Sequence, residues 1–190
     1  MTSHISTIYR LFDQPPSVRR IAGCTVIALD GRSGSGKTST ADALQALDPD
    51  LLILHVEDFY PGWDGLLAGI DRVVHDVLTP WQQGNAGKFR PWNWHSSQLE
   101  NREIEVPLPQ SKRVLIEGCG AGAQPIASLV SGVVWLTAPE EIRKTRALTR
   151  DGDIFRPHWN RWANQEKQLI ETDGTPCHAD LTINTDTVSK

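Results

Sequence analysis

The stretch "GRSGSGKTS", residues 31–39, decides which fold this sequence predicts. Its spacing is G-x-x-x-x-G-K-[ST], in which Gly31 and Gly36 are the fixed glycines and Lys37 and Thr38 follow them. An apolar, β-branched run of buried-strand length, "CTVIALD" (24–30), precedes the stretch. A run of helical character, "KTSTADALQAL" (37–47), follows it. Strand, glycine-rich loop and helix therefore come in the order that a phosphate-binding loop requires.

Backbone amides are expected to form the phosphate cradle of this loop. Glycines at 31, 34 and 36 permit positive φ and place no Cβ between the amides and an anion. The N-terminus of the following helix adds a favourable potential. We expect the Lys37 ammonium to bridge the β- and γ-phosphates and the Thr38 hydroxyl to ligate Mg²⁺. The sequence thus predicts ATP and Mg²⁺ as ligands, with nucleotide contacts from Gly31, Ser33, Gly34, Ser35, Gly36, Lys37, Thr38 and Ser39.

Asp30 is unusual, because it places a carboxylate immediately before the loop. If the side chain pointed into the cradle, it would repel phosphates. Pairing with Arg32 or with another cation outside the pocket would remove this conflict. The sequence leaves Asp30's role open.

Composition limits the class of protein. The chain has 190 residues, of which 39% are hydrophobic and 22% charged, and this suits one globular domain. A net charge of −4 argues against a nucleic-acid partner, and the longest apolar run is too short to span a bilayer. Three widely spaced cysteines suit a reducing compartment. We therefore expect a soluble cytoplasmic protein with no membrane partner, and we leave monomer or homo-oligomer open.

Strand and helix patterns alternate along the chain. Further strands are predicted at 51–58, 113–118, 132–138 and 179–185, and helices at 64–79, 139–152 and 158–171. Such alternation favours a parallel sheet covered on both faces. We predict one α/β domain over 1–190, with three α/β/α layers and a mainly parallel sheet of about five strands. Residues 1–20 are expected to form a peripheral lead-in, 80–112 an irregular excursion beside the site, and 139–172 a lid.

Acidic residues follow two of the predicted strands. Glu57 and Asp58 end the strand at 51–58, and Glu117 ends the strand at 113–118. Ligands of open α/β sheets bind beyond the carboxyl ends of the strands. A carboxylate there could orient an acceptor hydroxyl and take its proton, and Glu117 could assist Mg²⁺. The alternative is that these acids are only solvated.

A basic helix supplies the next candidates. Arg143, Arg146 and Arg150 stand at i, i+3 and i+7, on one helix face. Guanidinium groups stabilise the charge that spreads over a phosphoryl group in transfer, so we expect Arg146 and Arg150 to be catalytic and Arg143 to bind the nucleotide. The glycine in "RDGD" (150–153) suits a hinged cover. A solvated charged face is the alternative.

Together these residues resemble the uridine kinase-like family of P-loop nucleoside and nucleotide kinases, over about 24–185. The segment "VEDFY" (56–60) looks like the family's acid-x-Phe-Tyr segment, whose acid is the catalytic base. Aligning the aromatic pair puts that acid at Glu57, where the family usually has Asp, and puts Asp58 on a variable position that is sometimes acidic. The resemblance therefore implies the pair without ranking its members. "LIEG" (115–118) is similar to the Mg²⁺-linked strand end, and "EEIRKTRALTRD" (140–151) to the arginine lid.

The resemblance also extends to the acceptor side. "RPWNWH" (90–95) is similar to the family's Pro-x-Tyr-Asp-aromatic segment, which holds the acceptor's sugar. Here Trp92 replaces Tyr and Asn93 replaces Asp, which removes a charge. The aromatic residues could line an acceptor pocket, or they could pack the excursion against the lid. The residues considered for the acceptor pocket are Tyr60, Trp63, Trp92, Asn93, Trp94 and Trp159.

The resemblance implies an ATP-dependent phosphotransferase that moves the γ-phosphate to a hydroxyl of a small molecule, with a nucleoside as the favoured acceptor. Two alternatives stay open. One is a kinase for a non-nucleoside metabolite, such as a sugar acid or vitamin precursor, or for a nucleotide. The other is a P-loop ATPase or nucleotide switch that acts on a protein partner.

Overall fold

Five parallel strands form the central sheet of the computed structural model, which describes residues 3–94 and 96–186. The strand order is β2-β7-β1-β8-β9, and every neighbouring pair is parallel. The predicted α/β class and the five-stranded parallel sheet are confirmed. The strands are β2 (Leu52–His55), β7 (Arg113–Glu117), β1 (Thr25–Asp30), β8 (Gly132–Thr137) and β9 (Leu181–Asn184).

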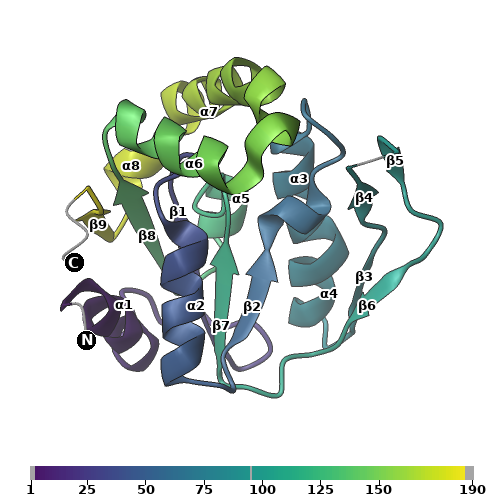
Figure 1. The fold of residues 1–190 in the computed structure, drawn as a ribbon. Coiled ribbons are helices and arrows are strands. Elements are labelled where there is room, and N and C mark those ends of the chain that lie inside the picture. The colour runs from purple at the N-terminus through teal and green to yellow at the C-terminus, as the bar shows by residue number, and fades with distance from the viewer. Residues whose placement is uncertain (1–2, 95, 187–190) are drawn as a thin grey trace.

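Helices cover both faces of the sheet (Figure 1). Side chains of β1 alternate between two core clusters, because successive residues of a strand point to opposite faces. Ile27 and Leu29 pack on the side of α1 (Ser3–Asp13) and α2 (Lys37–Leu47). Val26 and Ala28 pack on the other side. That side is covered by α3 (Leu66–Arg72), α4 (Thr79–Gln82), α5 (Gln124–Ala127) and α7 (Trp159–Asp173).

The helix α1 belongs to the core. Its residues Ile5, Ile8 and Phe12 are buried, and they lie in the same cluster as Leu44 of α2. The expectation that residues 1–20 form a peripheral lead-in is therefore wrong for this helix, while residues 1–2 lie outside the described part of the chain. The apolar face of α1 completes the cover of the sheet beside α2.

The segment after β2 differs from its predicted form. The strand ends at His55, and residues Val56–Phe59 form a single 3-10 turn, η1. The helix predicted at 64–79 starts at Leu66, continues through a π-helical segment, η2 (Val73–Leu78), and ends in α4 at Gln82. Pro80 has no N–H to bond to the preceding turn, and it is the second residue after the π-helical segment.

The excursion at 80–112 contains two small antiparallel sheets. One pairs β3 (Gly87–Phe89) with β6 (Ile104–Val106), and the other pairs β4 (Trp92–Asn93) with β5 (Gln98–Leu99). Trp81 is fully buried, and its indole N–H donates to the Val106 carbonyl at 3.2 Å. Phe89 stacks on Phe59 with ring centroids 4.2 Å apart. The excursion predicted to be irregular therefore contains short strands, and its base is part of the hydrophobic core.

The lid region lies beyond the carboxyl ends of the strands, where α6 (Glu140–Phe155) and α7 pass over β1 and β7 (Figure 1). Gly152 kinks α6 with φ 55° and ψ −132°, a conformation that other residues rarely adopt. A 3-10 turn, η3 (Arg156–His158), leads into α7, and α8 (Thr175–His178) precedes β9. Over the described ranges, no helix combines the length and apolar character needed to cross a bilayer.

Candidate active site

A cavity of about 1060 Å³ opens at the carboxyl end of the sheet. Its lining comes from the glycine-rich loop, the segment from η1 to Trp63, the end of β7 with the turn that follows, the lid, and Trp94 of the excursion. Loops that follow parallel strands meet at one edge of the sheet, which is why these segments converge. The loop contributes Ser33, Gly34, Gly36, Lys37, Thr38 and Ser39 to the lining.

The glycine-rich loop presents the start of α2 to the cavity. Gly36 caps this helix with φ 93° and ψ 16°, in the left-handed region. The helix begins at Lys37, as predicted, and the first amides of a helix have no acceptor within the helix. Gly34 also has positive φ, and a Cβ there would collide with the backbone of Arg143. These features fit the binding of a polyanion at the loop.

Asp30 holds the loop from behind. It is 2% exposed, and its carboxylate accepts the backbone N–H groups of Gly31 at 2.6 Å and of Gly120 and Gly122 at 2.9 Å. Burial raises the pKa of Asp30, and these three bonds oppose the rise. Asp30 thus binds amides instead of pairing with Arg32, and it ties the loop to the turn after β7.

Asp30→Ala is expected to lower the free energy of unfolding by at least ~3 kcal/mol, because it leaves three buried amides without an acceptor at about 1–3 kcal/mol each. Urea unfolding followed by circular dichroism measures the change. Asp42→Ala, at an exposed position of α2, is the matched control and should stay within about 0.5 kcal/mol of the wild type. A loss below about 1 kcal/mol for Asp30→Ala would contradict this role.

Arg143, Gly31 and Ser35 support the loop and do not line the cavity. Arg143 is 4% exposed, and it donates to the carbonyls of Ala138 and Ser33, both at 3.1 Å. The Ser35 carbonyl accepts the Thr185 hydroxyl at 2.8 Å. Within residues 3–94 and 96–186, the buried Ser35 hydroxyl has no hydrogen-bond partner. These three predicted nucleotide ligands thus lie outside the cavity lining.

Lys37 is the cation of the cradle. Its ammonium donates to the carbonyls of Gly31 at 2.7 Å and Arg32 at 3.3 Å, and it lies 3.5 Å from the Cys119 sulfur. Burial alone would lower the pKa of Lys37, but the nearby carboxylates of Glu117 and Glu166 help to raise it overall. The ammonium therefore stays charged while it is 7% exposed.

Three carboxylates line the cavity together with the loop: Glu57, Asp58 and Glu117. Glu57 and Asp58 were predicted to end a strand, but they lie on the 3-10 turn η1, which follows the end of β2 at His55. Burial raises the pKa of both, and the Glu117 charge raises each further. A raised pKa suits a group that accepts a proton near neutral pH.

The two predicted Mg²⁺ ligands lie side by side. The Thr38 hydroxyl is 3.5 Å from the Glu117 carboxylate, which also bonds to the His55 ring at 2.7 Å. In the part of the chain that the structure describes, no group of three or more His, Cys, Asp or Glu side chains could hold a metal alone. This arrangement fits Mg²⁺, which usually takes one or two protein oxygens and completes its shell with phosphates and water.

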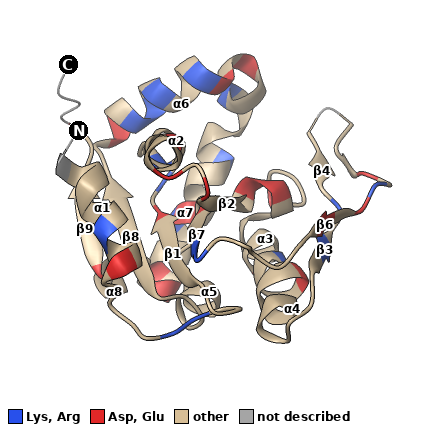
Figure 2. Ribbon diagram, turned by 90° about the horizontal axis from the view of Figure 1, so that it is seen from below, with Lys and Arg blue, Asp and Glu red and all other residues tan. Residues whose placement is uncertain are grey.

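Two of the three predicted lid arginines line the cavity. Arg146 donates to the hydroxyl and carbonyl of Thr185 at 3.2 and 2.8 Å. Arg150 bonds both oxygens of Asp151 at 2.7 Å, and this bond raises the pKa of Arg150. Figure 2 shows basic positions along α6 and acidic positions on the turn that follows β2. The cavity thus has cations on the lid side and carboxylates opposite them.

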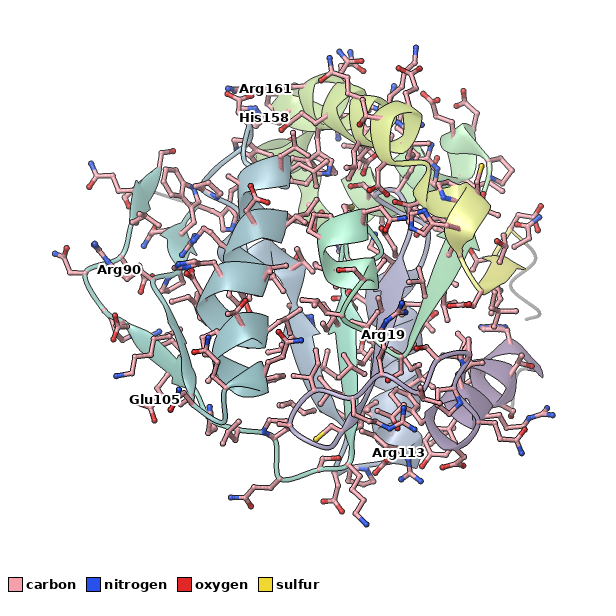
Figure 3. All side chains as sticks on the ribbon, turned by 180° about the vertical axis from the view of Figure 1, so that it is seen from behind. Arg19, Arg90, Glu105, Arg113, His158 and Arg161 are labelled. Carbon is pink, nitrogen blue, oxygen red and sulfur yellow. The ribbon has the colours of Figure 1, made fainter. Side chains whose placement is uncertain are left out.

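Aromatic residues form the far end of the cavity. Trp63 stacks on the His158 ring at 4.4 Å and on Phe155 at 5.4 Å, and it lies 4.7 Å from Trp94. Figure 3 shows His158 beside Arg161 at one end of α7. The Arg161 guanidinium pairs with Asp64, next to Trp63. Ring contacts, an ion pair and a hydrogen bond from Gln165 to the Trp63 carbonyl thus connect the lid with the segment after η1.

Only some of the predicted acceptor residues line this end of the cavity. Tyr60, Trp63 and Trp94 do, whereas Trp92, Asn93 and Trp159 do not. Trp92 lies against Gly62, and the Asn93 side chain accepts the Ser96 amide at 2.9 Å. Trp159 is buried and packs on Phe155. His95, which ends the same sequence segment, lies outside the described residues.

Sequence reasoning missed several cavity residues, chiefly Cys119, Asp151, Phe155 and Trp162. Trp162 follows Trp159 at i+3 on the inward face of α7, so helical spacing could have indicated its burial. Cys119 has no such signal. Burial raises its pKa to about 12, which keeps the thiol protonated beside Lys37.

Comparison with known proteins identifies the fold. No protein-family model matches this chain, and no curated protein matches its sequence significantly. A solved structure from Bacillus stearothermophilus, provisionally described as a uridine kinase, superposes with a TM-score of 0.65 at 16% identity and covers 94% of this chain and 96% of its own. A structure from Silicibacter sp. TM1040, provisionally described as a fructose transport system kinase, gives a TM-score of 0.60 at 17% identity, with 96% and 99% covered. The chain therefore has the three-layer α/β/α fold of P-loop kinases.

Proposed function

We propose that this protein is an ATP-dependent small-molecule kinase that transfers the γ-phosphate to a hydroxyl of its acceptor. The observation that carries the proposal is that one cavity joins the phosphate loop to two carboxylates and an aromatic end. A switch or motor would not need an acceptor site opposite its phosphates. The likeness to structures described as kinases supports the same choice.

Each part of the cavity has a role in this proposal. The loop amides and Lys37 bind the β- and γ-phosphates, and Arg146 and Arg150 neutralise charge on the transferring group. Glu57 or Asp58 orients the acceptor hydroxyl and accepts its proton, since both carboxylates line the cavity. Thr38 and Glu117 would hold Mg²⁺, which supplies charge stabilisation to the phosphates when bound.

A nucleoside is the favoured acceptor, because Tyr60, Trp63, Trp94 and Trp162 could stack on a flat base. Two observations favour a non-nucleoside acceptor instead. The Trp63 ring already stacks on His158 and Phe155, so less of its surface is left for a base. Trp92 and Asn93, which match the sugar-holding segment by sequence, also lie away from the cavity.

A screen of acceptors tests the proposal. The purified protein is incubated with MgATP and with nucleosides, nucleotides and small hydroxylated metabolites, and ADP release is recorded. We expect slow hydrolysis alone and much faster ADP release with one acceptor class, whose phosphorylated product is identified by mass spectrometry. If no small molecule accelerates ADP release and a macromolecule does, the kinase proposal is wrong.

Glu117→Gln is expected to raise the Mg²⁺ concentration for half-maximal activity by about 10-fold or more, the usual effect of changing a residue at a metal site. The amide keeps the shape of the side chain but loses the charge that attracts the cation. Titration of Mg²⁺ at saturating ATP and acceptor measures the shift. Glu105→Gln, at an exposed position of β6, is the control. If Glu117→Gln needs the same Mg²⁺ concentration as the wild type, Glu117 does not help to bind the metal.

A further inference from the structure

The helix α7 brings one buried carboxylate to the back of the phosphate loop. Glu166 is 3% exposed, whereas the side chain of Glu171, another acid of this helix, is 61% exposed. Glu166 stands on the inward face of α7, in line with Trp162 and Leu169. A carboxylate at such a core position is costly unless charged or polar groups satisfy it.

Two consecutive loop residues satisfy Glu166. One carboxylate oxygen accepts the Ser33 amide at 2.7 Å, and the other accepts the Arg32 Nε at 2.9 Å. The Arg32 guanidinium also donates to the Ala163 carbonyl, one turn earlier on α7, at 3.0 Å. The Cys119 thiol donates to Glu166 from the turn after β7 at 3.3 Å.

These contacts fix the orientation of the peptide groups on either side of Ser33. An amide that donates to Glu166 points to the back of the loop, and Glu166 does not line the large cavity. The Ser33 carbonyl is held in turn by Arg143 at 3.1 Å. Both peptide units that flank Ser33 are thus oriented before Gly34, where φ of +79° turns the chain toward the amides that start α2.

The ion pair between Glu166 and Arg32 also helps to arrange the loop. The Glu166 carboxylate draws the Arg32 guanidinium onto α7, although Arg32 lies inside the phosphate loop by sequence. Arg32 is not among the residues that line the cavity. The pair places a fixed cation and a fixed anion behind the loop, and Lys37 is the loop residue that brings a positive charge to the cavity.

We propose that Glu166 is a positioning residue for nucleotide binding, which holds the Ser33 amide and the Arg32 side chain so that the remaining loop amides converge on the phosphates. This inference rests on the proposed function, because it takes a nucleotide as the ligand of the loop. Glu166 acts through the loop backbone and does not touch the nucleotide.

The test is calorimetric titration of MgADP into the full chain and its variants. Glu166→Gln keeps the size of the side chain and removes its charge, and it should raise the Kd by about 10-fold or more, the scale of one hydrogen bond to a charged group. Glu171→Gln, the same change at an exposed site of α7, should leave the Kd unchanged. Circular dichroism and thermal unfolding show that each variant is folded at the titration temperature.

Gln165→Ala separates Glu166 from a general effect of α7. Gln165 donates to the Trp63 carbonyl at 2.6 Å, so its loss also loosens α7 but leaves the loop contacts in place. The inference is wrong if Gln165→Ala raises the Kd for MgADP as much as Glu166→Gln does. It is also wrong if Glu166→Gln binds MgADP with the Kd of the wild type. Should Glu166→Gln not fold, Glu166→Asp takes its place, because it keeps the charge but is one methylene too short to reach Ser33. Failure of the wild type to bind MgADP would refute the proposed function itself.

Discussion

Lys37→Ala is expected to abolish phosphoryl transfer, with a loss of about 10³-fold or more in kcat. Removing one preorganised donor from a charge-stabilising site costs about 10²–10³-fold, and Lys37 brings a full charge to the cradle. Burial excludes water from the ammonium, which is 7% exposed. Two neighbouring cations cannot replace it, because Arg32 is tied to Glu166 and Arg143 to the carbonyls of Ala138 and Ser33.

The fold should survive this change. The variant loses bonds to the carbonyls of Gly31 and Arg32, at a cost of about 1–3 kcal/mol. A domain is usually stable by about 5–15 kcal/mol, so Lys37→Ala should remain folded by circular dichroism. Lys144→Ala, at an exposed position of α6, is the control and should retain activity. Turnover retained in a folded Lys37→Ala protein would show that the loop does not serve catalysis.

Single replacement of the two acids on η1 is expected to identify the catalytic base. Either Glu57→Gln or Asp58→Asn should lower kcat by about 10²-fold or more, the usual contribution of a general base. The amide keeps the size of each side chain and cannot accept the proton. Since both carboxylates line the cavity and both have raised pKa values, geometry alone gives two candidates.

The pattern of the two losses assigns the roles. A large loss of kcat at one position with little change in acceptor KM marks the base, while a raised KM marks a residue that binds the acceptor. Asp71→Asn, on the exposed side of α3, controls for loss of an acid elsewhere and should leave both constants unchanged. If neither Glu57→Gln nor Asp58→Asn slows the reaction, the proton acceptor lies elsewhere.

Much of the fold could be read from local sequence. The helix after the glycine-rich loop runs from Lys37 to Leu47, as predicted, because its start is set by Gly36 and its composition favours a helix throughout. The strands at Thr25–Asp30 and Gly132–Thr137 also lie within their predicted ranges, since each is a short run of apolar and β-branched residues. The predicted strand at 51–58 ends early, at η1, and the helix predicted at 64–79 continues through a π-helical segment to Gln82.

The sequence could not show which charged residues face the cavity. Arg143, Arg146 and Arg150 share one helix face by spacing, but Arg143 is buried beneath the loop while the other two line the cavity. A helix face about two turns long passes from the core edge to the cavity, and spacing alone does not locate that boundary. The same reason separates Trp63 and Trp94, in the cavity, from Trp92, which packs on Gly62.

The sequence by itself determined the phosphate loop, because its chemistry depends on glycines, Lys37 and Thr38 that lie within a few residues of one another. Tertiary structure alone decided what holds that loop in place. Asp30 meets Gly122 from 92 positions away, Arg143 meets Ser33 from 110, and Glu166 meets Ser33 from 133. Such contacts form only when parallel strands bring their loops to one edge of the sheet, and no periodicity within a single element encodes them.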